Sequence, residues 1–422
     1  MHTMIMPSWW ESLLKRYLKR TFYEGTRRRD FADRGDFTEG DYRFFVKGVR
    51  DLNVYFTQER GLLPKNYLNR KELRSGYILY FMPVNALKVA ALLEQLPPET
   101  LAGNDGTLTI IDVGCGPGTG MLGTFLYLEN LRKAGTTPKG AAAAVRESPL
   151  RIRWVLIDQN RHALDDAQGI HDLILEEMRR RHPRWEIRSE IEPVVGDVFM
   201  NRLPRILHSH RSHAKDAHGA NLILGLNLLG EIARERRLAV VQDMVSFLHE
   251  RGRVLLMEPA LRRTSRDLMA LHDDLLENEL AWVYAPCLHQ AACPMLVGNE
   301  RDWCHAYIPW ERPRWLEKID RLIALRKEYP KCSYLILGGR GGAEPAKTSM
   351  TSWRVVSGPL NSKGKSERLL CGEDGLPGLL RIMRLDKDAS PANHAFDDLE
   401  RGDIVEMRKT SRVARDTTLK RI

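Results

Sequence analysis

Residues 108–120, LTIIDVGCGPGTG, decide the fold class of this chain. An apolar run ends at Asp112, a glycine-rich turn follows, and the next residues, MLGTFLYLENLRKA, have helical spacing. Glycines in such a turn let the backbone approach a ligand and adopt dihedral angles that other residues avoid. A strand, a glycine loop and a helix in this order predict a nucleotide-type α/β domain.

Further strands and helices alternate downstream of this loop. The predicted strands are RIRWVLID (151–158), EIEPVVGDVF (190–199, ending at Asp197), NLILGLNLL (221–229, with its turn) and GRVLLMEP (252–259). The intervening helices are predicted at about 161–181 and from the fourth strand to about Arg251. Such alternation predicts a mostly parallel sheet covered on both faces.

The flanking segments differ in pattern. Residues 8–100 have helical spacing, whereas short alternating runs after about residue 350 predict a small antiparallel β subdomain. Segments 133–150 and 201–219 are predicted to be a surface insertion and a mobile loop. We therefore predict an α/β fold in four parts: 1–105 helical, 106–280 cofactor-binding, 281–345 cysteine-rich loop, helix and strand, and 346–422 β subdomain with a basic tail.

The glycine loop indicates a particular cofactor. Asp112-Val113-Gly114-Cys115-Gly116-Pro117-Gly118 resembles the first motif of class I S-adenosylmethionine-dependent methyltransferases, which have a Rossmann-like sheet. The glycine spacing does not match the dinucleotide fingerprint, and the Gly-Lys-Ser/Thr of a P-loop is absent. The resemblance implies S-adenosylmethionine contacts from Asp112, Gly114, Gly116, Gly118, Asp158, Asp197 and Asn227.

Three of these residues have more specific expected roles. Asp158, at the end of the second strand, is expected to bind the ribose hydroxyls, and Asp197 to approach the adenine amino group. Asn227 follows the fourth strand, on the side where the substrate meets the methyl group. Ordinary solvated or capping acids are the alternative for the two aspartates. The catalytic residue stays unknown, because the fourth strand lacks the Asn/Asp-Pro-Pro-Tyr/Phe motif of amino-methylating enzymes.

Residues 281–305, AWVYAPCLHQAACPMLVGNERDWCH, form a second chemical feature. They contain Cys287, Cys293 and Cys304, together with His289 and His305, and Cys371 follows 66 residues later. Thiolates ligate zinc or iron–sulfur clusters. Three close cysteines and a remote one fit a four-iron cluster, and zinc held by three cysteines and one histidine is the competing metal site. Unliganded buried cysteines are the remaining alternative.

The cysteine motif also carries a family resemblance. Glu258-Pro259, then Ala285-Pro286-Cys287-x-His289-x3-Cys293-Pro294, then Asp302-Trp303-Cys304-His305 resemble the methyltransferase-like ribosomal small-subunit assembly proteins. These are the Rsm twenty-two family of mitochondria and its bacterial relatives, and the resemblance covers roughly residues 65–410. It implies binding to the small ribosomal subunit through its rRNA. It also implies a [4Fe-4S] cluster on Cys287, Cys293, Cys304 and Cys371, clamping the sheet to the β subdomain.

Composition bounds the remaining alternatives. The formal net charge is +10, which favours an acidic partner such as nucleic acid. No run of 18 apolar residues occurs, so no membrane span is expected, and six cysteines in 422 residues do not indicate a disulfide framework. We expect a cytoplasmic monomer, with the mitochondrial matrix as the alternative location. The competing functions are an active RNA or protein methyltransferase with a zinc site, and a non-catalytic RNA-binding scaffold.

Overall fold

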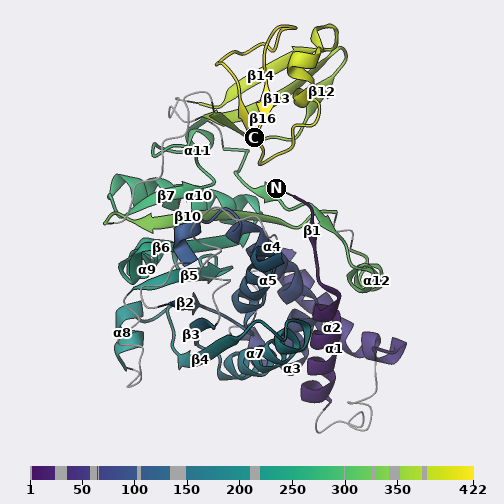
Figure 1. Ribbon diagram of the computed structural model, residues 1–422, viewed down its shortest axis with the longest axis vertical. Coiled ribbons are helices and arrows are strands. Elements are labelled where there is room, and N and C mark those ends of the chain that lie inside the picture. The colour runs from purple at the N-terminus through teal and green to yellow at the C-terminus, as the bar shows by residue number, and fades with distance from the viewer. Residues whose placement is uncertain are drawn as a thin grey trace. The chain divides into compact units, whose positions relative to one another are not determined.

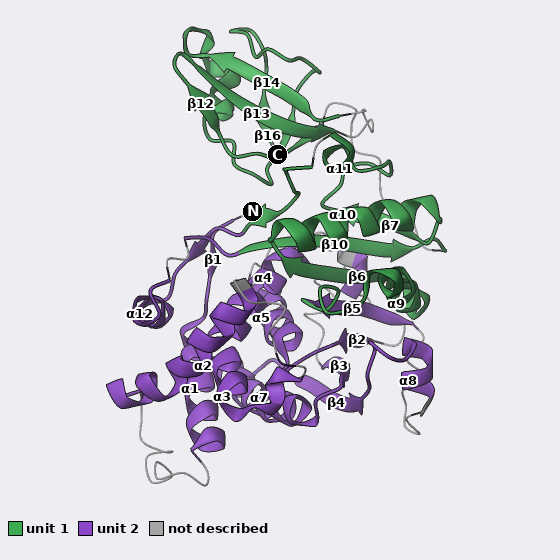
Figure 2. Ribbon diagram, turned by 180° about the vertical axis from the view of Figure 1, so that it is seen from behind, with its two compact units in different colours: residues 1, 227–307, 331–422 green, residues 2–226, 308–330 purple. Residues whose placement is uncertain are grey.

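The computed structural model describes residues 2–23, 36–57, 64, 66–101, 106–133, 149–209, 219–298, 300–325, 328–341, 352–372 and 378–422. Its contacts divide the chain into two compact units (Figure 2). Unit 1 holds Asn227–Tyr307 and Lys331–Ile422, and unit 2 holds His2–Leu226 and Ile308–Pro330. Of the predicted insertion, 133–150, residues 134–148 lie outside the described residues.

Unit 2 contains four parallel strands in the order β4-β3-β2-β5. Their bounds are β2 Thr107–Val113, β3 Leu150–Asp158, β4 Ile187–Val195 and β5 Ala220–Leu226. Every residue of β5 is buried, as a parallel strand covered on both faces requires. The connecting helices are α5 Thr119–Lys133, α7 Arg161–Arg181 and α8 Leu203–Ser209. These elements confirm the predicted α/β class and its parallel strands.

The predicted N-terminal helical region is confirmed within unit 2 (Figure 1). It contains β1 Met4–Ile5, α1 Ser8–Phe22, α2 Glu39–Thr57, a 3-10 turn Tyr67–Asn69, α3 Lys71–Gly76, a π-helical turn Tyr77–Phe81, α4 Met82–Leu93 and a 3-10 turn Pro98–Leu101. Further along the chain, β9 Trp310–Glu311 pairs with β1, and α12 Arg314–Leu322 follows it. Helices α4 and α5 pack closely, because a Cβ on Gly123 would lie 2.5 Å from the Ala86 carbonyl oxygen.

The helical run Lys71–Leu93 is long and apolar enough to cross a membrane by length and composition. Its most apolar window is 89% buried inside the protein, as expected for a core helix. In α1, Lys15 and Lys19 are also buried. Lys15 binds Glu11, and the Lys19 ammonium lies 3.8 Å from an Asp41 carboxylate oxygen. The charges of these two lysines are therefore paired within unit 2 and do not contribute to binding a partner.

Unit 1 begins with antiparallel strands in the order β6-β10-β7, and β8 also pairs with β10. Their bounds are β6 Leu248–Pro259, β7 Ala281–Ala285, β8 Ala306–Tyr307 and β10 Lys331–Gly339. The helices of this part are α9 Arg234–Ser246, α10 Arg262–Glu277 and α11 Pro294–Gly298. Cys332 lies within β10, opposite Pro259, and is fully buried.

The C-terminal part of unit 1 is the predicted antiparallel subdomain. Its strands have the order β12-β13-β11-β15-β16, and β14 pairs with β13. The bounds are β11 Ser352–Val355, β12 Leu360–Ser362, β13 Lys365–Gly372, β14 Leu380–Leu385, β15 Ile404–Glu406 and β16 Lys420–Arg421, with 3-10 turns at Asp386–Asp388 and Pro391–Phe396. Trp353, Leu370, Ile382 and Phe396 fill its core.

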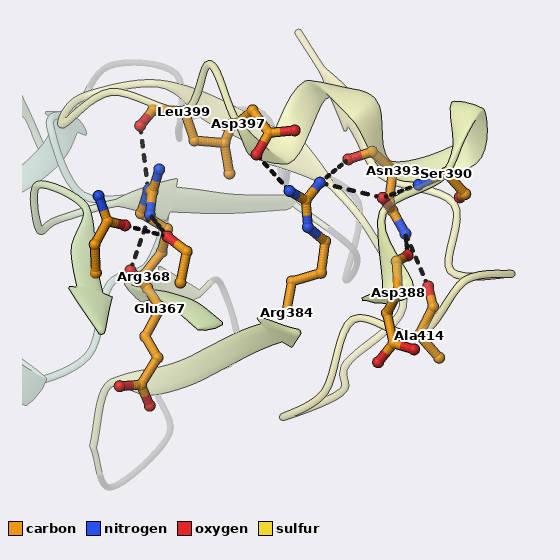
Figure 3. Close-up of polar contacts among 11 residues, drawn as sticks. Glu367, Arg368, Arg384, Asp388, Ser390, Asn393, Asp397, Leu399 and Ala414 are labelled. Carbon is orange, nitrogen blue, oxygen red and sulfur yellow. Dashed lines mark hydrogen bonds and ion pairs between the residues drawn. The ribbon is translucent and has the colours of Figure 1, made fainter. Parts of the chain in front are cut away.

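Two buried arginines hold the turns onto this sheet (Figure 3). Arg384 donates to the Asp397 carboxylate and to the Asn393 side-chain oxygen, the latter at 3.3 Å. Arg368 donates to the carbonyl oxygens of Leu399 and Glu367 at 3.3 and 3.0 Å. Both guanidinium groups are therefore used by the subdomain itself.

Four predicted boundaries were wrong. Residues 203–209 of the predicted loop form α8, because Leu203, Ile206 and Leu207 give a buried helical stripe, while 210–218 lie outside the described residues. Helix α9 ends at Ser246, and not near Arg251, since β6 begins at Leu248. Strand β4 ends at Val195, two residues before Asp197. The spacing of WLEKIDRLIALRKEY (315–329) predicts an amphipathic helix over this run, but α12 ends at Leu322, and Ala324 then has a left-handed φ of 55°.

Candidate cofactor loop and cysteine cavity

The glycine loop between β2 and α5 is a tight left-handed turn. Gly114, Gly116 and Gly118 have φ values of 70°, 53° and 90°, a region that favours glycine. The backbone N–H groups of Gly114 and Cys115 both donate to the Ile157 carbonyl oxygen, at 2.8 and 3.1 Å. The loop is therefore fixed against the end of β3. Cys115 is buried in this turn.

Asp158 binds the loop directly. One oxygen of its carboxylate accepts from the Gly116 N–H at 2.8 Å, and the other accepts from the Asn160 N–H at the same distance. Burial raises the pKa of Asp158, and these backbone donors oppose the rise. The Asp158 carboxylate therefore links the end of β3 to the glycine loop. Its expected contact with the ribose hydroxyls stays a prediction.

Asp112 lies beneath the loop at the end of β2. Its carboxylate is fully buried, and neither oxygen has a hydrogen-bond partner among the described residues. A Cβ on Gly120 would lie 2.5 Å from one of these oxygens, so this helical position requires glycine. Burial, and next the nearby Asp158 carboxylate, raise the pKa of Asp112 to about 8. Such a group stays protonated at neutral pH unless a ligand supplies a donor or a positive charge.

Asp112→Asn is expected to flatten the pH dependence of stability. The folded protein keeps a proton on Asp112 that the unfolded chain loses near pH 4, so this group lowers stability as pH rises toward 8. Between pH 6 and 8 the free energy of unfolding of the wild type should fall by about 2 kcal/mol more than that of the variant. Urea unfolding at both pH values measures the difference. Asp165→Asn, at an exposed carboxylate on α7, is the control and should follow the wild type.

The other predicted cofactor residues lie in two places. Asp197 is in the turn after β4, where its carboxylate accepts from the Phe199 N–H at 2.7 Å. The neighbouring Gly196 N–H donates to the Asp158 carbonyl oxygen at 3.0 Å, which keeps this turn near the loop. Asn227 belongs to unit 1, where its N–H donates to the Met257 carbonyl oxygen at 2.6 Å. Unit 2 thus brings together all the predicted cofactor residues except Asn227.

Some residues around the loop were missed from the sequence. A Cβ on Gly116 would have the Leu68 side chain as its nearest neighbour, at 3.9 Å. Tyr77 also forms a 3.3 Å hydrogen bond with Thr119, the first residue of α5. Both Leu68 and Tyr77 come from the N-terminal helical region, where the sequence shows no motif. Their position depends on tertiary packing.

The four cysteines predicted as ligands line one cavity of about 60 Å³ in unit 1. This is several times the ~10–15 Å³ that one water molecule needs. Cys287 follows β7, Cys293 precedes α11, Cys304 precedes β8, and Cys371 lies on β13. His289, His305 and Arg354 also line the cavity, and none of the four cysteines is in a disulfide.

The thiols influence one another electrostatically. Burial and next the other three cysteines raise the pKa of Cys287 well above its usual value, and burial with Cys304 raises the pKa of Cys293 to about 11. Burial also raises the pKa of Cys304, but the positive charges of Arg401 and Arg354 oppose this rise. Burial, and next Arg401, lower the pKa of His305 to about 4, so this histidine is neutral at pH 7.

Neighbouring polar groups orient the cysteine segment. The Cys371 Sγ atom lies 3.5 Å from Nε2 of His289. An Asp273 carboxylate oxygen accepts from the Cys293 N–H at 2.8 Å, and the Ser333 hydroxyl donates to the Cys304 carbonyl oxygen at 2.6 Å. Among the described residues no three His, Cys, Asp or Glu side chains are grouped closely enough to hold a metal ion. The cavity is thus shared by the four cysteines, while their role as ligands stays a prediction.

Comparisons with solved structures returned methyltransferases at low similarity. A SAM-dependent methyltransferase from Leishmania major has 12% identity and a TM-score of 0.34, covering 70% of this chain and 82% of that one. A protein described as a class I S-adenosylmethionine-dependent methyltransferase from Listeria monocytogenes has 12% identity and a TM-score of 0.32, with coverages of 81% and 92%. A search of curated proteins gave no match.

A family model gives the more specific result. Residues 186–383 match the model described as "Mitochondrial small ribosomal subunit Rsm22". The matched range begins just before β4, ends within β14 and includes the four cysteines of the cavity. The resemblance predicted from the cysteine motif is thereby confirmed, and over residues 186–383 this chain is similar to the Rsm22 family.

Proposed function

We propose that this chain is a methyltransferase-like protein that acts in small ribosomal subunit assembly or translation. It binds S-adenosylmethionine at the glycine loop, binds rRNA, and carries an iron–sulfur cluster on its four clustered cysteines. The observation that carries the cofactor assignment is the left-handed glycine loop above Asp112, whose buried carboxylate lacks a donor among the described residues. A cofactor with an ammonium group and hydroxyl donors complements this acidic site.

The methyl transfer proposed for this site requires few catalytic groups from the protein. The sulfonium of S-adenosylmethionine supplies an activated methyl group, so alignment of donor and acceptor is the main requirement. Asp112 and Asp158 would supply negative charge at the loop, and Gly116 would let the backbone approach the cofactor. No side chain here is assigned as a base, because the methyl acceptor that would need one is not identified.

Isothermal titration calorimetry with S-adenosylmethionine tests the cofactor assignment. We expect saturable binding of one cofactor per chain, weakened by Asp158→Ala, which removes the acceptor of the Gly116 N–H. No heat of binding at millimolar cofactor would reject both the leading proposal and the active-methyltransferase alternative. The chain would then be a non-catalytic RNA-binding scaffold.

The donor set of the cavity fits the proposed cluster. Four cysteines that form no disulfide come from two chain segments and line one cavity, and Cys₄ is the usual ligand set of a [4Fe-4S] group. Cys287, Cys293, Cys304 and Cys371 would hold it and thereby link the segment after β7 to strand β13. The zinc alternative is supported by His289, whose ring lies beside Cys371. Anaerobic purification with visible absorption and metal analysis decides between them: a colourless protein with one zinc overturns the iron assignment.

The proposed rRNA contact predicts a salt dependence that localises to the C-terminal subdomain. Arg408, Arg415 and Lys420 are exposed there, and each phosphate contact adds about one to the slope of log affinity against log salt. Replacing all three by glutamine should lower this slope by about two to three in co-sedimentation with small subunits. Glutamine at Arg161, Arg180 and Arg188, exposed in unit 2, makes the same charge change and is the control. Equal effects of both triples contradict the localisation.

The family match also bears on the proposed location. Its description names the mitochondrial small ribosomal subunit, which favours the mitochondrial matrix over the cytoplasm. Cell fractionation of the tagged protein tests this choice, and co-fractionation with cytosolic markers alone would contradict it.

A further inference from the structure

Arg354 lies beside the cysteine cavity because of strand register. On β11 it is directly opposite Cys371 of β13 on one side and Ile404 of β15 on the other. Directly opposite residues of antiparallel strands lie on the same face of a sheet, so Arg354 and Cys371 are neighbours. Arg354 lines the cavity with the four cysteines. One guanidinium nitrogen donates to the Gly402 carbonyl oxygen at 2.9 Å, whereas the buried Nε atom has no partner among the described residues.

Arg401 approaches the same cysteines from a different segment. It immediately precedes Gly402, which also lines the cavity, and its guanidinium carbon lies 5.7 Å from the centre of the Tyr307 ring. The Nε and Nη1 atoms of Arg401 are buried and have no partner among the described residues. Arg401 is therefore a second cation next to a cavity-lining residue, and two of its guanidinium nitrogens have no acceptor among the described residues.

Arg384 in the same subdomain shows how a buried arginine is neutralised there. Arg384 is paired with the Asp397 carboxylate, and Arg368 with carbonyl oxygens (Figure 3). Arg401 instead lies beside the Tyr307 ring, and Arg354 and Arg401 each keep at least one buried nitrogen without a partner among the described residues. A buried cation is costly unless an anion neutralises it. Cysteine thiolates around a metal would supply that negative charge.

We propose that Arg354 and Arg401 are the counter-charges of the cysteine cavity and retain a thiolate-ligated, anionic metal group by neutralising its charge. This inference rests on the proposed cysteine ligation. Four cysteinates leave a [4Fe-4S] group, or a single divalent cation, with net negative charge, so either would gain from the two cations. For an iron–sulfur group, nearby positive charge also raises the reduction potential.

Charge-removing and charge-retaining variants separate this role from packing. Arg354→Met and Arg401→Met remove the cation and keep an apolar stem, while Arg354→Lys and Arg401→Lys keep the charge. Arg381→Met is the control, since Arg381 is an exposed arginine on β14 of the same sheet. Each full-length protein is loaded in one series with iron and sulfide and in another with Cd²⁺. The rate of loss to a chelator is followed by visible absorption for iron and by thiolate-to-cadmium charge-transfer absorption for Cd²⁺.

The expected result is loss about 10-fold faster from each methionine variant, near-wild-type retention in the lysine variants and no change in the control. The reduction potential of the iron form should fall in the methionine variants only. Equal losses from the lysine and methionine variants overturn the proposal, because they indicate a packing role. If the wild type holds Cd²⁺ but no iron–sulfur group, only the proposed cluster is rejected. The cadmium series then tests whether the two arginines retain the bound metal. A wild type that holds neither overturns both.

Discussion

Cys304→Ser is expected to empty the cysteine cavity of metal and to make the C-terminal sheet sensitive to protease while unit 2 stays resistant. Cys304 and Cys371 line the same cavity but come from the segment before β8 and from β13. A metal group on both would therefore link two parts of unit 1. Structural zinc contributes about 10–16 kcal/mol in zinc-finger peptides, so loss of one ligand should have a large effect. Limited proteolysis with mass spectrometry, alongside iron analysis, measures both consequences.

Cys115→Ser is the matched control for this change. Cys115 is also a buried free cysteine, but it lies in the glycine loop of unit 2. Its variant should keep full iron content and an unchanged digestion pattern for residues 352–422. If both units of the Cys304→Ser variant are equally resistant to protease, the cysteines do not stabilise the C-terminal subdomain, whichever metal they bind.

The parallel strands could be predicted because their apolar runs are short and bounded by turn residues. Strand β3 and helix α7 were predicted within one residue of their observed bounds, Leu150–Asp158 and Arg161–Arg181. Helix α8 was missed because its buried stripe lies in a segment dominated by His and Arg. The end of α12 depends on the left-handed Ala324, and alanine gives no sequence signal for that conformation.

The candidate sites were predictable in their residue types but not in their partners. The four cysteines share a cavity, as their clustering in sequence suggested. The placement of Arg354 beside Cys371 depends on the register of β11 against β13. A shift of this register by one residue would move the two side chains to opposite faces of the sheet. Likewise, the sequence did not predict that the Asp158 carboxylate accepts a hydrogen bond from the Gly116 N–H. Such partners are set by tertiary packing, and the spacing of residues along the sequence does not indicate them.

Gly116→Ala is expected to weaken S-adenosylmethionine binding by about 10-fold or more while the protein stays folded. Among the described residues an added Cβ would meet no atom nearer than the Leu68 side chain at 3.9 Å, so the methyl group occupies space that these residues leave open. If the cofactor approaches the backbone there, this methyl group must collide with it. The left-handed φ of 53° adds strain of about 1–2 kcal/mol, which unfolding in urea would register.

Gly106→Ala separates this strain from exclusion of the cofactor. Gly106 also has a left-handed φ, 76°, and an added Cβ would have no neighbour within 4 Å in the part of the chain that the structure describes, but it lies in the turn before β2 and outside the loop. Both variants should lose similar stability, and only Gly116→Ala should lose affinity in calorimetry. If both bind the cofactor as the wild type does, the ligand does not approach Gly116. If both lose affinity equally, strain at the two ends of β2 is the cause, because steric exclusion can act only at the loop.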